Sequence, residues 1–451
     1  MLRKPLVQLF IRLLVKTRPR ITRRSNKMEI DVLIKNIKEL VNPANDRVVR
    51  GSELNSIRVS HNVWLGAVGE RIAFIGYEED FNKNCTLAED GIVIDGSDFV
   101  VFPGFVDPHT HLPFAHTRQD EFREKLQGVS YQEIAARGGG IKGTVRKTRE
   151  IDANELIQQC EGRLDHILTA GTTTLEAKSG YGLDLDTEIK QLEVLKGLNA
   201  IHPIDIVSTF MGAHEIPEEY KDRNKEFLDY LIENVVPVVK ERELAEFADI
   251  FCENGVFSYE EADYYFDKIE PYGFKIKLHA DEFSSNNAAI LAVKKKAVSA
   301  EHLIAMTDEE IDAISASDTA CVFLPGVSFF LKLGKYAPIR KVIEKNGIVT
   351  LGTDFNPGSS MVSSQLFCFH LGIFNMGLTI EEAINTITIN AAYGIDRHES
   401  VGSIAVGKKM DMLLMDIPDY SYLAYHLGIN PVHTVIKSAE VVVKERQAVY
   451  E

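Results

Sequence analysis

The stretch Val-Phe-Pro-Gly-Phe-Val-Asp-Pro-His-Thr-His at residues 101–111 decides how the rest of the chain is interpreted. Its apolar first half is typical of a buried strand, and His109 and His111 stand where that strand ends. On an extended chain, residues two apart leave the same face, so both imidazoles can converge on one point. A single His-x-His pair is a weak signal of a metal site. Its value depends on whether the later strands also end in polar residues.

Seven further apolar runs come after it, and stretches with helical character separate them. The eight expected strands are Val100–Val106, Thr172–Ala177, Asp205–Met211, Ala248–Cys252, Phe274–His279, Ala297–Ala300, Cys321–Leu324 and Ile348–Gly352. This alternation favours a closed barrel over an open doubly wound sheet, and no glycine-rich phosphate-binding sequence comes after the first strand. We therefore expect an α/β fold in which residues 99–395 form a (β/α)₈ TIM-like catalytic barrel.

The segments on either side of this barrel are predicted to be rich in β-structure. Short apolar or alternating runs at 30–40, 58–76 and 91–95 are separated by Asn, Pro and Gly, and similar runs return near residues 412 and 435. We expect residues 28–98 and 396–451 to form one small β-sandwich domain, with the barrel inserted between its two parts.

The first 27 residues differ from the rest of the chain. They contain nine lysine or arginine side chains and no acidic residue, and their apolar residues recur at helical spacing. Such a basic leader resembles a transit peptide or a membrane-surface helix, and it is too short and too charged to span a bilayer. The alternative is an extension upstream of a chain that starts at Met28. In either case we expect residues 1–27 to be disordered or an extension.

Composition restricts the partners of the folded part. A formal net charge of −16 opposes binding to nucleic acid and is compatible with a small ligand held by local charges. The five cysteines are scattered without regular spacing, which indicates reduced thiols in a reducing compartment.

Groups that bind metals or move protons stand at the ends of five of the eight expected strands. In (β/α)₈ barrels, catalytic residues lie at the carboxyl ends of strands. With His109 and His111, His279 and Asp354 offer three imidazoles and a carboxylate, a set suited to Zn²⁺ or another first-row divalent metal. Taken alone, each histidine would more simply be a structural residue. Glu282, His302 and Asp354 are the candidates for moving the protons of a water molecule.

At this point the sequence resembles a known superfamily, the amidohydrolases. The resemblance is carried by residues 103–111, His-Ala-Asp-Glu-Phe (279–283), Gly-Thr-Asp-Phe-Asn-Pro-Gly (352–358) and residues 402–413. A more specific set is similar to the imidazolonepropionase family: residues 121–134, Gly-Gly-Gly-Ile (138–141), Lys-Ser-Gly-Tyr-Gly-Leu (178–183) and Gly-Ala-His-Glu (212–215). The likeness runs from about Met28 to the C-terminus.

The resemblance implies hydrolysis of 4-imidazolone-5-propanoate to N-formimidoyl-L-glutamate in histidine degradation, with one Zn²⁺ or Fe ion per chain. Relatives with two metals present a carboxylated lysine from strand four. Here Cys252-Glu253-Asn254 stands at that strand end, so we expect one ion. The resemblance also implies a cytoplasmic homodimer without nucleic-acid or membrane partners.

The same resemblance assigns the residues around the substrate. Arg118 is expected to bind the propanoate arm, and Tyr181 and His214 to contact the imidazolone ring. Tyr131 and Asn356 are further candidates for substrate binding. Solvated surface is the alternative for Arg118, core packing for Tyr131, and a flexible lid for the triple glycine. Glu282 and His302 are expected to act on the attacking water, and which of them is the general base stays open.

Two other functions are weighed against this one. Another metal-dependent cyclic amidohydrolase or deaminase would keep the metal ligands but not segments 121–141 and 178–183, which are present here. A non-catalytic barrel would have no chemical reason to keep all four candidate ligands.

Overall fold

The computed structural model describes residues 27–129, 133–134 and 137–450. Two expectations fall outside this part of the chain: the basic leader, apart from Lys27, and the substrate role of Tyr131.

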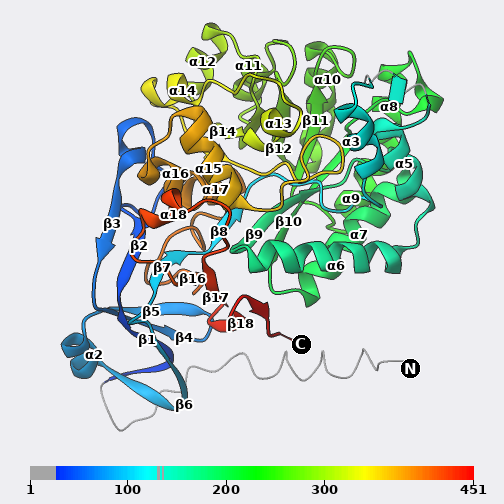
Figure 1. Ribbon diagram of the computed structural model, residues 1–451. Coiled ribbons are helices and arrows are strands. Elements are labelled where there is room, and N and C mark those ends of the chain that lie inside the picture. Colours follow the sequence, from blue (N-terminus) through cyan, green and yellow to red (C-terminus); the bar gives the residue numbers. More distant parts are fainter. Residues whose placement is uncertain (1–26, 130–132, 135–136, 451) are drawn as a thin grey trace.

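Within the described residues, eight parallel strands form the sheet at the centre of the larger unit (Figure 1). They are β8 (Phe105–Asp107), β9 (Thr172–Lys178), β10 (Asp205–Ala213), β11 (Phe247–Cys252), β12 (Lys275–Ala280), β13 (Ser299–His302), β14 (Ala320–Phe323) and β15 (Val349–Leu351). Each strand pairs with the next one along the chain, as expected for strands that short β-α-β connections join. The expected (β/α)₈ architecture is confirmed.

The barrel closes between its first and last strands. A parallel bridge joins Thr110 to Phe355 just beyond β8 and β15. His111 N donates to Phe355 O, and Asp354 N donates to His109 O, both at 3.0 Å. Closure therefore places the end of the 101–111 motif, with His109 and His111, beside Asp354 and Phe355 of the 352–358 motif.

Helices surround this sheet and fill the connections between its strands (Figure 1). After β8 come α3 (Gln119–Leu126), α5 (Gly140–Glu150) and α6 (Ala153–Thr169); the next connections carry α7 (Leu185–Ile201), α8 (Asn224–Tyr230), α9 (Val236–Glu241), α10 (Tyr259–Ile269), α11 (Ala288–Lys294), α12 (Asp308–Ser315), α13 (Pro325–Phe330) and α14 (Ile339–Glu344). After β15 come α15 (Gln365–Met376), α16 (Ile380–Thr386) and α17 (Ile389–Gly394). Local sequence sets several starts. Ser258, Thr307 and Thr379 each begin a helix with a capping box that satisfies otherwise unpaired backbone N–H groups.

The two chain ends meet in a smaller β-rich unit beside the barrel (Figure 1). One sheet has the order β19-β18-β17-β16-β7-β2-β3, and the other has the order β5-β4-β1-β6. The strands are β1 (Met28–Ile37), β2 (Glu39–Pro43), β3 (Ile57–Ser60), β4 (Val63–Val68), β5 (Arg71–Gly76), β6 (Cys85–Asp95), β7 (Val100–Pro103), β16 (Met412–Met415), β17 (Val432–Lys437), β18 (Glu440–Lys444) and β19 (Gln447–Ala448). The short helix α2 (Glu78–Asn84) completes it, and α18 (Tyr422–Tyr425) packs against α15 of the barrel. Buried side chains of both sheets share one apolar cluster, so the sheets pack on each other.

Two expected strands need correction. The run Val100–Val106 is not one barrel strand: β7 pairs with β16 and β2 of the smaller unit, and only β8 enters the barrel. Gly104 separates them, where any Cβ would collide with Thr173. The sixth strand runs from Ser299 to His302 rather than from Ala297 to Ala300, because Glu301 and His302 pair with His279 and Ala280 of β12.

All five cysteines lie among the described residues, where they are buried and unbonded to one another. No helix in that part of the chain is long and apolar enough to cross a membrane.

Candidate metal centre

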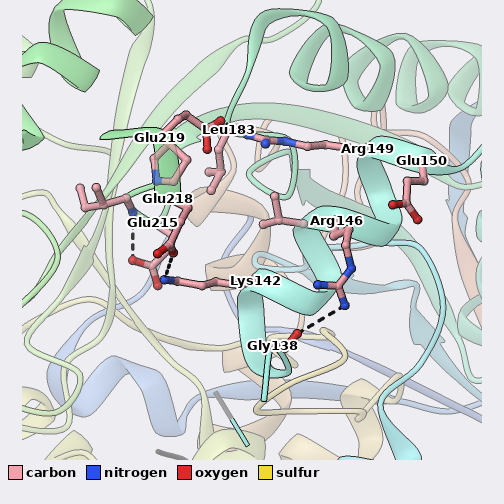
Figure 2. A pocket seen from close by; sticks show the side chains of 12 residues that line it. Gly138, Lys142, Arg146, Arg149, Glu150, Leu183, Glu215, Glu218 and Glu219 are labelled. Carbon is pink, nitrogen blue, oxygen red and sulfur yellow. Dashed lines mark hydrogen bonds and ion pairs between the residues drawn. The ribbon is translucent and has the colours of Figure 1, made fainter. Parts of the chain in front are cut away.

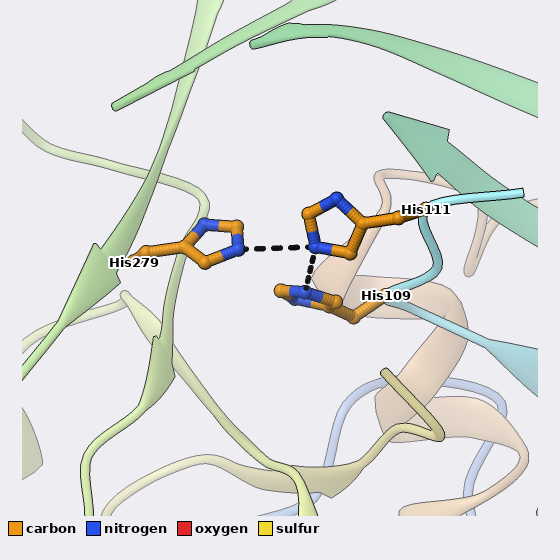
Figure 3. A group of neighbouring side chains, drawn as sticks. All are labelled: His109, His111 and His279. Atoms are coloured by element: carbon orange, nitrogen blue, oxygen red, sulfur yellow. Dashed lines mark hydrogen bonds between the residues drawn. The ribbon is translucent and has the colours of Figure 1, made fainter. Parts of the chain in front are cut away.

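Three imidazoles from opposite sides of the barrel point toward one another at its carboxyl end (Figure 3). His111 Nε2 lies 3.2 Å from His109 Nε2 and 3.3 Å from His279 Nε2. The carboxylate of Asp354 joins them, with Oδ1 at 3.1 Å from His109 Nε2 and 3.4 Å from His111 Nε2. The structure thus brings together all four of the metal ligands expected from the sequence.

These distances match the requirement of a small divalent metal. Zinc–nitrogen bonds of about 2.0–2.1 Å arranged as a tetrahedron place the ligand atoms roughly 3.4 Å apart. All four side chains are buried, and within the described residues Asp354 Oδ1 accepts no hydrogen bond of good geometry. Four ligand atoms crowded at one point, one of them an unsatisfied buried anion, form a site that fits a metal ion.

Backbone conformation fixes the direction of two residues at this centre. Asp354 (φ 51°) and His302 (φ 72°) both lie in the left-handed region. Side chains with a Cβ adopt this region rarely, and such positions cluster at functional sites. The conformation turns each side chain back toward the barrel axis at the point where its strand ends.

Carboxylates hold the outer nitrogen of two of these imidazoles. His279 Nδ1 donates to Asp249 Oδ2 at 2.9 Å, and His109 Nδ1 lies 2.5 Å from Glu301 Oε2. A histidine that donates from Nδ1 keeps its Nε2 lone pair free, and carboxylates behind metal-binding histidines generally fix the ring in this way. Both imidazoles are therefore oriented for binding through Nε2.

Glu282 and His302 lie next to this cluster. His302 Nδ1 is 3.6 Å from Glu282 Oε1, and both side chains are buried. Burial, together with Asp354 and Glu253, raises the pKa of Glu282 well above its ordinary range, while burial lowers the pKa of His302 to about 3. His302 also groups with His109 and Asp354 as a possible ligand. The structure therefore places both proton-transfer candidates at the centre.

Tyr181 and His214 form one wall beside His111. The His214 ring stacks on His111 at 4.8 Å between centroids, and the Tyr181 ring lies 5.3 Å from His214. His214 Nδ1 lies 3.0 Å from Gly180 O. Gly180 has φ +108°, and a Cβ there would come within 3.0 Å of His214, so only glycine fits.

A buried carboxylate fixes the loop that carries Tyr181. Glu188 of α7 accepts backbone N–H bonds from Gly180 (3.1 Å), Gly182 (2.8 Å) and Leu183 (2.9 Å). Three such bonds hold the loop rigidly, because a charged acceptor strengthens each of them.

Arg118 lies at the start of α3 and is mostly buried, with 10% of its side chain exposed. Its Nε donates to Glu121 at 2.8 Å, and Glu121 also accepts from the backbone N of Gly140, where the triple glycine enters α5. A Cβ on Gly358 would come within 2.6 Å of the Arg118 guanidinium. This guanidinium therefore packs on the loop after Asp354 and is not solvated surface.

Asn356, expected to bind substrate, has its polar atoms engaged within the protein. Its Nδ2 donates to Asp354 Oδ2 at 2.8 Å, and its Oδ1 accepts from the backbone of Gly358 and Ser359 at 2.8 Å. This arrangement favours a role in orienting Asp354.

A cavity of about 420 Å³ lies between α5 and the loop after β10 (Figure 2). Lys142 is paired with Glu218 beside it, and Arg149 with Glu219 at 2.8 Å. None of the candidate metal ligands lines this cavity. It borders the His214 side of the site without containing the reacting centre.

The sequence interpretation missed a layer of buried charges beneath the metal centre. Its members are Glu176, Lys178, Asp249, Lys277 and Glu301, all fully buried. A signal was present: each of these charges stands within or next to an expected strand, and a charge in a buried strand requires a partner.

Comparisons with known proteins agree with this geometry. Residues 100–443 match the amidohydrolase family. The chain is 44% identical to the imidazolonepropionase of Alkaliphilus oremlandii, over 93% of this chain and 99% of the relative. It is also 44% identical to that of Clostridium tetani, over 92% of this chain and 99% of the relative.

Solved structures show the same fold at much lower identity. A zinc-bound adenosine deaminase from Xanthomonas campestris aligns with a TM-score of 0.64 at 15% identity, over 94% of this chain and 95% of that one. Guanine deaminase from E. coli aligns with a TM-score of 0.68 at 14% identity, over 91% and 98% of the two chains. Taken together with the near full-length match to curated relatives, the ligand geometry and the barrel identify this chain as a member of the amidohydrolase family and, within it, of the imidazolonepropionases.

Proposed function

We propose that this chain hydrolyses 4-imidazolone-5-propanoate to N-formimidoyl-L-glutamate, a reaction of histidine degradation. The observation that carries the proposal is the convergence of His109, His111, His279 and Asp354, whose ligand atoms lie 3.1–3.4 Å apart, in a chain 44% identical to imidazolonepropionases. In the reaction, a bond forms between water oxygen and the ring carbonyl carbon, and the carbon–nitrogen bond of the ring breaks. One water proton ends on the nitrogen that leaves.

We propose that His109, His111, His279 and Asp354 hold one Zn²⁺ or Fe ion. Such an ion lowers the pKa of water and polarises a carbonyl group. Lys178 and Lys277 support a single ion. Each has its ammonium within 3.0 Å of a buried carboxylate, and a carboxylated lysine there would face like charges.

Proton transfer is assigned to the buried pair beside the ligands. Glu282 is proposed to accept the proton of the attacking water and return it to the leaving ring nitrogen. The neutral imidazole of His302, 3.6 Å from Glu282, is proposed to donate a hydrogen bond to the oxygen on which charge develops. Burial of both side chains excludes bulk water from this transfer.

Substrate binding is assigned to Arg118, Tyr181 and His214. Arg118 is proposed to bind the propanoate carboxylate, since a guanidinium provides two parallel donors. Its position against the loop after Asp354 supports this role. Tyr181 and His214, which pack beside His111, are proposed to contact the ring. Tyr131 stays a candidate for substrate binding.

The direct test is turnover of the freshly generated substrate. Loss of the ultraviolet absorption of imidazolonepropanoate, with N-formimidoylglutamate identified by mass spectrometry, is the expected result. Absence of turnover by metal-loaded protein, with hydrolysis of a different cyclic amide or amidine, would contradict the substrate assignment. We also propose a cytoplasmic homodimer. Sedimentation at the mass of one chain would contradict the dimer.

A further inference from the structure

A buried lysine connects the two carboxylates that hold the metal-facing imidazoles. Lys178 is the last residue of β9, and its side chain is fully buried. Its Nζ lies 2.7 Å from Glu176 Oε1, 3.0 Å from Asp249 Oδ2 and 2.9 Å from Glu301 Oε2. Its backbone N donates to Thr110 O, between the two histidines of the first motif, at 2.9 Å. Both ends of this residue therefore contact the framework of the metal centre.

The carboxylate oxygens involved are the ones that face the imidazoles. Asp249 Oδ2 accepts from His279 Nδ1 at 2.9 Å, and Glu301 Oε2 lies 2.5 Å from His109 Nδ1 and 3.7 Å from His279 Nδ1. One ammonium thus lies between the two oxygens that orient two of the three imidazoles. Lys277 differs, because its ammonium contacts the other oxygen of Glu301, Oε1, at 2.9 Å.

Electrostatics makes this arrangement depend on the lysine. The ammonium lies within 3.0 Å of one oxygen of each carboxylate. Without this cation, the two negatively charged oxygens would repel each other strongly in an interior that excludes water. If the cation were removed, the side chains of Asp249 and Glu301 would rotate apart, and each imidazole would lose the group that fixes its ring.

We propose that Lys178 is a positioning residue of the metal centre. It holds Asp249 and Glu301 where they orient His279 and His109, so metal affinity depends on a side chain that is not itself a ligand. The inference rests on the metal site assigned under the proposed function.

The experiment measures binding of Co²⁺ to metal-free, full-length protein. Lys178→Met is expected to raise the Kd for Co²⁺ by about 10- to 100-fold, the range found for residues behind metal ligands, and to change the visible absorption spectrum of bound Co²⁺. The matched control is Lys437→Met, which removes another buried, ion-paired lysine, located in β17. It is expected to leave Kd and spectrum unchanged. Parental Kd and spectrum in a folded Lys178→Met variant would overturn the inference.

A second comparison serves if Lys178→Met does not fold. The double variant Lys178→Gln/Asp249→Asn removes one charge of each sign. Because Lys178 still acts through Glu301 when Asp249 is neutral, the double variant is expected to bind Co²⁺ more weakly than Asp249→Asn alone; equal Kd values for the two variants would overturn the inference. Failure of the parent chain to bind Co²⁺ would overturn the metal site itself. A parent that binds and a Lys178→Met variant that binds equally well would overturn only the role of Lys178.

Discussion

Two clusters of opposite charges in the described part of the chain, one fully buried and one partly buried, stabilise different parts of the molecule. At the carboxyl end of the barrel strands, Lys178 joins carboxylates that contact His109 and His279. At the start of β10, Asp205 Oδ2 lies 2.7 Å from Lys437 and 2.8 Å from Lys409. Lys437 also lies 2.5 Å from Asp411 Oδ2.

The second cluster joins the smaller β-rich unit to the barrel. In it, the carboxylates of Asp205 and Asp411 contact the ammonium groups of lysines. In the first cluster each key carboxylate divides its contacts between an ammonium and an imidazole. The far nitrogens of these imidazoles then meet at one point with His111 and Asp354. A buried ion pair is structural by itself. It contributes to function where its carboxylate also orients a side chain that binds the metal.

Loss of a ligand from the first cluster is expected to have the largest effect. His279→Ala removes one imidazole of three, so bound metal and turnover should both disappear, with kcat/KM lower by roughly a thousandfold or more. Metal analysis and the imidazolone assay check this. Near-normal turnover would show that His279 is not a metal ligand.

The second expected effect concerns the substrate rather than the metal. Arg118→Ala removes the proposed carboxylate partner and should raise KM at a cost of about 2–5 kcal/mol, with metal content unchanged. Steady-state kinetics with metal analysis measures both. An unchanged KM would mean that the propanoate binds elsewhere.

Breaking the second cluster should affect stability alone. Lys437→Met leaves the buried Asp411 without its cation, while Asp205 keeps Lys409, so the free energy of unfolding should fall by about 3 kcal/mol, the lower end of the range for broken buried pairs. Chemical denaturation measures this change, while kcat/KM of the folded protein stays at the parental value. If Lys437→Met lost metal but kept its stability, the purely structural role of the second cluster would be contradicted.

The loop that carries Tyr181 offers a smaller test. Glu188→Gln keeps one oxygen, which can still accept from Gly182 and Leu183, but it removes the charge and places an NH2 group where Oε2 accepts from Gly180. KM should rise by about tenfold, near 1.4 kcal/mol, because charge-assisted hydrogen bonds are stronger than neutral ones. Metal affinity should not change. Kinetics that match the parent would show that the loop is held by other contacts.

The smallest expected effect is a pH dependence of the second cluster. Burial opposes the charge on Asp205, but Lys437 and Lys409 outweigh it and lower its pKa. A lowered pKa stabilises the fold above the unfolded value of about 3.9, and this stability is lost as pH falls through the folded pKa. Asp205 is 35% exposed, so screening should limit the contribution to under about 1 kcal/mol. Asp205→Asn should flatten the stability curve below about pH 4. A curve as steep as that of the parent would assign the acid sensitivity to other groups.

Sequence patterns predicted the barrel well because its strands alternate with helices, and because each candidate ligand lies at the end of a strand. They misjudged the first strand, since Val100–Val106 is apolar throughout and pairing with β16 leaves no mark in composition. The roles of Asn356 and Lys178 were not predictable from their own segments. Each depends on partners brought close by barrel closure or by neighbouring strands.

The central claim is that one metal ion at His109, His111, His279 and Asp354 is required for hydrolysis. It is tested most directly by titrating metal-free protein with Zn²⁺ or Fe²⁺ while monitoring the loss of imidazolonepropanoate. Activity is expected to rise linearly with added metal and to stop rising at one ion per chain. Full activity in the rigorously metal-free protein, or saturation with metal without any turnover, would contradict it.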